Sequence, residues 1–396
     1  SMSKKVIVAL SGGVDSSVAA LILKKQGYHV IGIFMKNWHD ESVTISNECP
    51  WLEDSNDALI ISEKLGIPFQ VIDLSKEYKK RIVDYMFSEY KEGRTPNPDI
   101  LCNKEIKFDI FLSKAESLGA DYIATGHYCR KKESKKGNKK IYKLIEGKDN
   151  TKDQSYFLCQ LNQIQLSKVL FPIGDLKKTD VRKIAKENGL ITANKKDSQG
   201  LCFVGKIKLP EFLQQKLKIK RGKIIKVAPD EKIFKKVLKN VKDENYLKKS
   251  VQKHKYSESS GEMIGYHDGA HFFTIGQRKG LQVGGFKKPL FVIEKDVKKN
   301  IIYVGEGENH PGLYRQGLLI KSNDINWLRP DLKISLNSSE KILARIRYRQ
   351  TLKPAQIFSR KEGLYLVFNK KQKSISSGQF AAWYKEKELI GSGIIY

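Results

Sequence analysis

The sequence predicts an α/β protein with a parallel-sheet domain, a small central β-rich domain and a C-terminal antiparallel β-barrel. Over residues 5–125, short apolar runs alternate with segments of helical periodicity, which is typical of a parallel sheet with helices on both faces. Beyond residue 263, short apolar runs are separated by Gly, Asn and Pro, a pattern typical of a small antiparallel barrel. A chain of 396 residues is long enough for two or three domains.

The elements expected in the first half follow from these patterns. A buried strand is expected at 5–10, and further strands at 29–35, 67–72 and 121–125. Helices are expected at 16–26, 56–65, 77–90, 104–118, 163–169 and 179–188. Gly27 and Gly66 follow two of them, as glycine often does at helix ends. A lysine-rich hairpin is expected at 129–145, with Gly137-Asn138 at its tip.

The second half sets the domain boundaries. Barrel strands are expected at 291–293, 301–304, 341–349, 365–368 and 389–395. We therefore expect a catalytic domain over 1–209, a central linking domain over 210–284 and the barrel over 285–396. Within the central domain, residues 225–255 form a basic insertion with helical stretches.

The charge balance favours a polyanionic partner. Lys and Arg number 73 against 44 Asp and Glu, a formal net charge of +29. Such a charge favours nucleic acid, although a merely solvated basic surface is the alternative.

The sequence also argues against several protein classes. No apolar run approaches the roughly 18 residues of a membrane span, and no secretory signal pattern opens the chain. Five cysteines without a CxxC pair argue against a disulfide scaffold and a four-cysteine zinc site. We therefore expect a cytoplasmic protein with no membrane partner.

A glycine loop lies between the first expected strand and helix, at residues 11–17 (Ser-Gly-Gly-Val-Asp-Ser-Ser). Its two glycines let backbone N–H groups approach an anion, and the helix start adds its positive dipole end. The loop lacks the Gly-Lys-Ser/Thr of a Walker A motif. Asp15 is unusual in an anion site, unless it holds a magnesium ion or orients the loop. Phosphate binding is favoured over an ordinary turn.

This loop resembles the motif of the PP-loop ATP pyrophosphatases, which adenylate a substrate oxygen and release pyrophosphate. Nearly end to end, the chain resembles one family among them, the bacterial-type tRNA-specific 2-thiouridylases. Residues 225–255 depart from the family, being longer and more basic than its usual linker. The matching stretches are 8–17, 93–108, 124–128, 152–158, 195–205, 271–285, 347–350 and 377–379.

The resemblance implies an enzyme with an adenine nucleotide alpha hydrolase-like first domain that thiolates the wobble uridine of tRNA. It implies ATP and Mg²⁺ as cofactors, the tRNA anticodon arm as partner, and a persulfide sulfur-carrier protein or cysteine desulfurase as sulfur donor. We expect a monomer.

The resemblance also assigns catalytic roles. Cys202 would carry a persulfide and Cys102 would be the resolving nucleophile, with a Cys102–Cys202 disulfide as product. Asp99, three residues before Cys102, matches the family's acid/base position. From the residues alone, each cysteine is more often structural, and Asp99 could be a turn aspartate. Cys49, Cys129 and Cys159 match nothing catalytic.

Binding residues are implied in the same way. The ATP site would be lined by Ala9, Leu10, Ser11, Gly12, Gly13, Val14, Asp15, Ser16, Met35 and Gly126. Contacts to tRNA would come from Asn97, Pro98, Asp99, His127, Lys152, Asp153, Gln154, Arg347, Tyr348 and Gln379. No residue is assigned to a metal. If residues 341–349 form a strand, then Arg345, Arg347 and Arg349 share one face, which suits a phosphate backbone or is simply solvated.

Three alternatives stay open. A PP-loop ligase acting on a small molecule would explain the glycine loop but not the cysteine pair or the charge. A non-catalytic RNA-binding protein with a vestigial nucleotide site would explain the charge. An iron–sulfur cluster held by Asp99, Cys102 and Cys202 would change only the mechanism.

Overall fold

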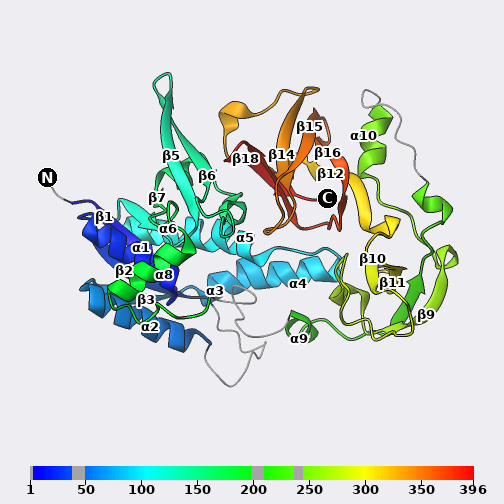
Figure 1. Cartoon of the computed structure of the whole chain (residues 1–396), viewed down its shortest axis with the longest axis horizontal. Helices are drawn as coiled ribbons and strands as arrows, with labels where there is room; N and C mark the ends of the chain where they lie inside the picture. The colour runs from blue at the N-terminus through cyan, green and yellow to red at the C-terminus, as the bar shows by residue number, and fades with distance from the viewer. Residues whose placement is uncertain (1–2, 38–49, 198–208, 236–243) are drawn as a thin grey trace.

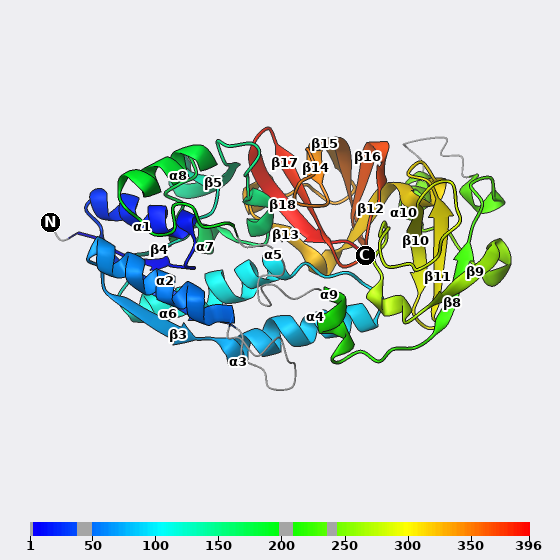
Figure 2. The same ribbon diagram turned by 60° about the horizontal axis from the view of Figure 1, so that its bottom comes forward.

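The computed structural model describes residues 3–37, 50–197, 209–235 and 244–396. Its three parts follow one another along the long axis (Figure 1). The parallel sheet lies at one end, a small four-stranded sheet at the other, and the barrel strands between them, as Figure 2 also shows. No helix in these ranges is long and apolar enough to cross a membrane.

The parallel sheet has the strand order β3-β2-β1-β4-β7. Its strands are β1 (Lys5–Ala9), β2 (His29–Lys36), β3 (Phe69–Asp73), β4 (Tyr122–Ala124) and β7 (Val169–Leu170), all parallel. Side chains alternate between two cores: Val6 and Val8 pack into one, Ile7 and Ala9 into the other. The parallel sheet and the buried first strand are therefore confirmed, whereas the edge strand β3 is partly exposed.

Both faces of the sheet are covered. One core is closed by helices α1 (Val14–Lys25), α2 (Pro50–Leu65) and α8 (Lys178–Glu187). The other is closed by two long helical segments, residues 75–91 and 98–117, together with barrel side chains such as Phe380 and Tyr384. The first segment comprises α3 (Ser75–Tyr78), a π-helical stretch (Lys79–Val83) and α4 (Asp84–Lys91).

The second segment begins earlier than the sequence predicts. It comprises α5 (Pro98–Cys102), a π-helical stretch (Asn103–Phe111) and α6 (Leu112–Ser117). The expected start at residue 104 is wrong because Asn97 caps the helix and Pro98 occupies its first position. Cys102 therefore lies inside the helix, beyond its first turn, and not in a loop before it.

The barrel sheet takes in a hairpin from the N-terminal half of the chain. The hairpin β5 (Cys129–Lys136) and β6 (Lys139–Glu146) forms as expected, and β6 pairs with β18. The strand order is β12-β16-β15-β14-β17-β18-β6-β5. The remaining strands are β12 (Tyr314–Lys321), β13 (Ile325–Trp327, paired with β18), β14 (Ser339–Arg345), β15 (Lys353–Arg360), β16 (Gly363–Lys373), β17 (Phe380–Lys385) and β18 (Glu388–Ile394).

The expected row of three arginines is wrong. Strand β14 ends at Arg345, and the chain then turns, so Arg347 and Arg349 lie beyond the strand. Arg345 is only 6% exposed and forms ion pairs with Glu146 (2.8 Å) and Asp153 (3.3 Å). It therefore serves the interior, and the phosphate-facing row does not exist.

The central sheet is larger than expected. Its order is β10-β11-β8-β9, from β8 (Gly222–Lys226), β9 (Glu262–His267), β10 (Leu290–Asp296) and β11 (Ile301–Glu306). The strands expected at 291–293 and 301–304 therefore belong to this sheet and not to the barrel, because β11 pairs with β8. The sheet thus continues past the boundary expected after residue 284. In the basic segment 225–255, helix α10 (Glu244–Val251) packs through Leu247 on barrel residues.

Candidate active site

The glycine loop lies where the strand order of the parallel sheet reverses. β2 and β3 lie on one side of β1, and β4 and β7 on the other, so the carboxyl ends of β1 and β4 mark the switch point at which such sheets bind ligands. The loop follows β1, and Gly126 follows β4. A Cβ at Gly126 would lie 2.6 Å from the Ser16 nitrogen, so the close approach of the two segments requires glycine.

The loop is preformed by its own hydrogen bonds. The Ser11 amide donates to Ser16 Oγ (3.1 Å), the Gly13 amide to Ser11 Oγ (3.3 Å), and Ser17 Oγ donates to the Gly13 carbonyl (2.6 Å). Gly12 has a φ of 82°. Gly13 is the N-cap of α1, and no side chain caps the helix there. The first-turn N–H groups are therefore available to an anion, and the loop fits the phosphates of ATP.

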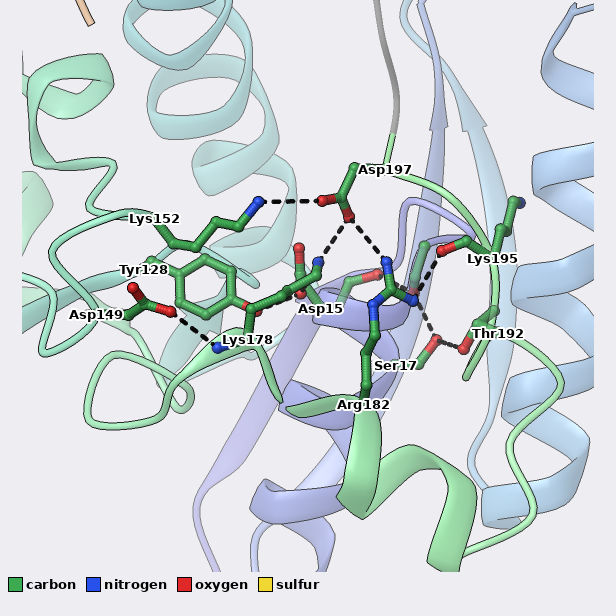
Figure 3. A network of polar contacts seen from close by, with 12 residues as sticks. Asp15, Ser17, Tyr128, Asp149, Lys152, Lys178, Arg182, Thr192, Lys195 and Asp197 are labelled. Atoms are coloured by element: carbon green, nitrogen blue, oxygen red, sulfur yellow. Dashed lines mark hydrogen bonds and ion pairs between the residues drawn. The ribbon is translucent and has the colours of Figure 1, made fainter. Parts of the chain in front are cut away.

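Asp15 orients the loop through two partners. Its Oδ1 accepts hydrogen bonds from the Tyr128 hydroxyl (2.6 Å) and from Lys178 Nζ (2.7 Å) (Figure 3). Of the two roles expected for Asp15, these contacts favour orientation. The described residues contain no group of three or more His, Cys, Asp or Glu that could hold a metal ion.

Lys178 and Lys195 place two cations beside the loop (Figure 3). Lys178, with an 11% exposed side chain, bridges Asp15 and Asp197 (2.6 Å). Arg182 and Lys152 also face Asp197, at 3.8 and 3.7 Å. Lys195 Nζ donates to the Gly12 carbonyl (2.8 Å) and pairs with two carboxylates of α2, Asp54 (2.6 Å) and Asp57 (2.7 Å).

These cations were missed by sequence reasoning. Lys178, Arg182 and Lys195 lie more than 160 residues beyond the loop, in segments without a nucleotide-binding motif. The packing of α8 against α1 brings Lys178 and Arg182 there. Lys195, beyond α8, is held by its ion pairs with α2. The resemblance covered residues 195–205, and this was the one signal that could have pointed to Lys195.

Asp99 and Cys102 share one face of α5. A spacing of three residues places them one turn apart. Cys102 is 1% exposed. Burial raises the pKa of Asp99, and the nearby Lys107 opposes this only in part, so Asp99 holds a proton more readily than an ordinary aspartate. Such a carboxyl beside a thiol can move a proton.

The other cysteines divide into two groups. Cys49 and Cys202 lie outside the described residues, so the Cys102–Cys202 pairing and the alternative iron–sulfur cluster stay predictions. Cys129 and Cys159 are buried, and burial raises the pKa of both thiols, that of Cys159 to about 12. Buried thiols with raised pKa values are inert, in agreement with a packing role.

Comparison with known proteins covers almost the whole chain. Residues 4–206 match the family model described as tRNA methyl transferase HUP domain, 244–306 its PRC-barrel domain, and 316–395 an aminomethyltransferase beta-barrel domain. A relative from Christiangramia forsetii is 60% identical, covering 99% of this chain and 100% of its own. A relative from Flavobacterium johnsoniae is 59% identical, covering 99% of this chain and 100% of its own. A relative from Karelsulcia muelleri is 52% identical, covering 99% of this chain and 98% of its own. All three are named tRNA-specific 2-thiouridylase MnmA.

This chain belongs to the tRNA-specific 2-thiouridylase family. The resemblance seen in the sequence is thereby confirmed, and so is the fold class: a HUP domain with a parallel sheet, a middle PRC-barrel domain and a C-terminal antiparallel domain. Membership also makes the chain an enzyme of the 2-thiouridylase class, whose PP-loop domain uses ATP.

In this 2-thiouridylase family member, two predicted tRNA contacts far apart in the sequence meet. Asn97 Nδ2 donates to Gln379 Oε1 (3.4 Å), and Gln379 Nε2 donates to the Pro96 carbonyl (3.3 Å). The Thr95 amide donates to the Ser377 carbonyl (2.8 Å). The barrel thus holds the loop from which α5 begins.

Three more of the predicted residues, His127, Met35 and Gln154, are partly buried. His127 bonds to Thr125 Oγ1 (2.7 Å), and burial, assisted by Lys107, puts its pKa well below the usual range, so its ring is neutral. Met35 packs partly buried against the core below the barrel. Gln154 accepts from the Tyr128 amide (2.9 Å).

The last four predicted contacts differ in their exposure. Asp153 is 6% exposed and accepts from Gly147, Ser155 and Arg345, so its carboxylate serves the interior. Tyr348 packs on Phe157, with ring centroids 4.3 Å apart, and its hydroxyl faces the Lys152 carbonyl. Arg347 is exposed and donates to the Lys373 carbonyl. Exposure leaves Arg347 able to reach a phosphate.

Proposed function

We propose that this protein uses ATP to replace the C2 oxygen of the wobble uridine of tRNA with sulfur. One observation carries the proposal. In a member of the 2-thiouridylase family, a preformed glycine loop with an uncapped helix start lies at the switch point of the sheet. The helix that bears Asp99 and Cys102 packs on the same sheet.

The need for ATP follows from the substrate. The C2 carbonyl of uracil is a poor electrophile with a poor leaving oxygen, and transfer of AMP to that oxygen makes it a good leaving group. In our proposal the N–H groups of the glycine loop, with Lys178 and Lys195 beside them, stabilise the charge of the departing pyrophosphate. Mg²⁺ would neutralise further phosphate charge when bound.

Sulfur transfer would use the cysteine pair. A persulfide on Cys202, loaded by a sulfur-carrier protein or cysteine desulfurase, holds the sulfur to be delivered. The Cys102 thiolate attacks the inner sulfur of Cys202, forms a disulfide and releases hydrosulfide, which attacks C2 as AMP leaves. Asp99 accepts the proton of the Cys102 thiol and donates it to the released sulfide, which leaves as hydrosulfide. A thiol reductant must then reduce the disulfide before another turnover.

We propose that the protein acts as a monomer and that the tRNA docks across the parallel sheet and the barrel. Asn97, Pro98 and Asp99 would meet the target base, which must leave its stack. The basic surface and Arg347 would hold the anticodon arm through its phosphates.

Nucleoside mass spectrometry tests the reaction. Unmodified tRNA is incubated anaerobically with the protein, Mg-ATP and a persulfide donor, then digested. We expect 2-thiouridine that depends on ATP. Pyrophosphate release without thiouridine would indicate another acceptor, such as the substrate of a small-molecule ligase. If neither thiouridine nor pyrophosphate is formed, the result would favour an RNA-binding protein with a vestigial nucleotide site.

A cysteine substitution tests the sulfur step. Cys202→Ser should keep pyrophosphate release and lose thiouridine, whereas Cys129→Ser, at a buried thiol outside the proposal, should keep both. Thiouridine formation by Cys202→Ser would refute the persulfide role. Visible absorbance of an anaerobically purified protein would instead support an iron–sulfur cluster.

A further inference from the structure

A small cavity lies where the three parts of the molecule meet. Its walls include Thr95 from the segment between α4 and α5, Lys295 from β10 of the central sheet, and Arg315 and Ser377 from the barrel. Helix α4 runs from the parallel sheet toward this junction (Figure 1). The cavity volume is about 40 Å³, which suits water or a small ion and not a nucleoside.

The walls carry an excess of positive charge. Lys253, Lys295 and Arg315 line the cavity, and Glu294 is the one acidic residue among its described lining residues. Burial lowers the pKa of Lys295 to about 8 and that of Arg315 to about 10, while the attraction of Glu294 opposes both shifts. The positive charges therefore lack full compensation, and buried charge without a partner costs free energy.

The cavity also holds unused hydrogen-bond donors. Arg315 spends two of its N–H groups on the Val251 carbonyl (2.9 Å) and the Ile375 carbonyl (3.1 Å), and three remain. Lys253 donates to Ser377 Oγ (2.7 Å), and Lys295 donates to the Phe273 carbonyl (2.5 Å), so each ammonium group keeps two further N–H groups. The buried hydroxyl of Tyr256, another lining residue, has no hydrogen-bond partner within the described part of the chain. Donors converge here, and one carboxylate cannot satisfy them.

We propose that this cavity binds a phosphate group, with Arg315, Lys295 and Lys253 as its cationic ligands and Tyr256 as a neutral donor. The planar fork of arginine matches phosphate oxygens. The phosphate comes either from the RNA backbone, in which case the site deepens the proposed function, or from free inorganic phosphate. A bound phosphate would join the central sheet to the barrel beside Ser377, which holds the Thr95 loop before α5.

Lysine labelling of the unmodified full chain tests the site without a variant. Acetylation rates of Lys295 and of Lys298, an exposed lysine just after β10, are compared by peptide mass spectrometry in chloride, in inorganic phosphate at equal ionic strength, and with tRNA. At ten times the dissociation constant, a ligand should slow labelling of Lys295 by about tenfold and leave Lys298 unchanged. Protection by phosphate identifies the free ion; protection by tRNA alone identifies the backbone. Equal labelling of Lys295 under all conditions, or equal protection of both lysines by tRNA, would overturn the site.

A substitution gives a second readout. Lys295→Gln should flatten the salt dependence of tRNA binding by about one unit of slope if a backbone phosphate is lost, or abolish the phosphate protection of Lys253 if the ligand is free phosphate. Lys298→Gln is the matched control. The thiouridine assay distinguishes this site from the proposed function. Thiouridine formation without protection of Lys295 would reject the phosphate site and support the proposed function. Protection of Lys295 without thiouridine formation would support the site and reject the function.

Discussion

At the scale of single residues, the site depends on charges that hold one another in place. Asp15 would repel a phosphate, yet it lies in the glycine loop. Its carboxylate is engaged by Lys178 and the Tyr128 hydroxyl, so its charge is compensated and its contacts orient the first turn of α1. Lys178 in turn brings Asp197 to the loop. A carboxylate in an anion site is thus explained by its partners.

The substitution Lys178→Met should impair nucleotide use. It removes a cation beside the loop and leaves Asp15 and Asp197 without their shared partner, so we expect ATP affinity to fall by about tenfold or more, the effect of losing one charge-assisted contact. The measurement is pyrophosphate release against ATP concentration. Lys183→Met, on the same helix with a 73% exposed side chain, should behave as wild type. An unchanged KM for ATP in Lys178→Met would contradict the role.

We expect the carboxyl group of Asp99 to lower the free energy of unfolding at neutral pH. Because burial raises its pKa, the folded state binds the proton more tightly than the unfolded state, and stability falls as pH rises through the pKa. Asp99→Asn removes this loss. The variant should be more stable than wild type at neutral pH, equal to it in acid, and inactive in thiolation.

Urea unfolding at a series of pH values measures this difference. Asp175→Asn, whose parent carboxylate is 82% exposed, should show no such pH-dependent gain. A gain for Asp99→Asn that is equal at acid and neutral pH would contradict the titration of Asp99.

At the scale of elements, the start of α5 determines where the proposed catalytic residues lie. Asn97 Oδ1 accepts from the Ile100 amide (3.1 Å), and Pro98 follows at the first helical position. The helix therefore begins before Asp99 and Cys102, and both become part of one rigid face. The barrel holds the same loop through Ser377 and Gln379.

Loss of this cap should weaken the protein. Asn97→Ala removes the acceptor for the Ile100 amide and should lower the free energy of unfolding by about 1 kcal/mol, measured by urea denaturation. Asn97→Asp keeps an oxygen acceptor and should retain most of that stability. Equal losses in the two variants would mean that the cap contributes little and that the Gln379 contact dominates.

At the scale of the whole molecule, the catalytic domain and the barrel share one core. The cluster that covers one face of the parallel sheet includes Phe380, Ala382, Tyr384 and Leu389 of the barrel. Strand β6 of the hairpin pairs with β18. Arg345 joins the barrel to Glu146 and Asp153 through a buried ion-pair network. We therefore expect these two parts to unfold together.

Breaking that network should destabilise both parts. Arg345→Leu leaves the buried carboxylate of Asp153 and the partly buried carboxylate of Glu146 without their cation and should cost about 3 kcal/mol. Guanidinium unfolding is followed by the protection of amides from exchange, measured separately for strand β16 of the barrel and for helix α1. Arg349→Leu, at an exposed position, is the control. A loss confined to the barrel signal would argue against a shared core.

Periodicity and turn residues predicted four of the five strands of the parallel sheet and the 129–145 hairpin, because these depend on local sequence. The helices were expected in the right places, but α2 begins at Pro50, before its expected start at residue 56. The expected start at residue 104 is too late, because the cap at Asn97 and the proline that follows it begin the helix at Pro98. The arginine row failed because strand length depends on pairing: β14 ends where its pairing with β15 and β17 ends. The strands β10 and β11 were wrongly assigned to the barrel, because the sheet to which a strand belongs depends on its pairing partner, and β11 pairs with β8.

The sequence by itself determined the family, the position of the glycine loop and which cysteines are candidates for sulfur transfer, because relatives share motifs that are contiguous in the chain. Only the tertiary structure decided which cations surround the loop, that Asp15 is engaged by Lys178 and Tyr128, that Asn97 meets Gln379, and that Lys253, Lys295 and Arg315 face one cavity. Such contacts join residues tens to hundreds of positions apart. Neither spacing nor composition specifies them; they arise when helices and strands pack, and this packing brings the charges together.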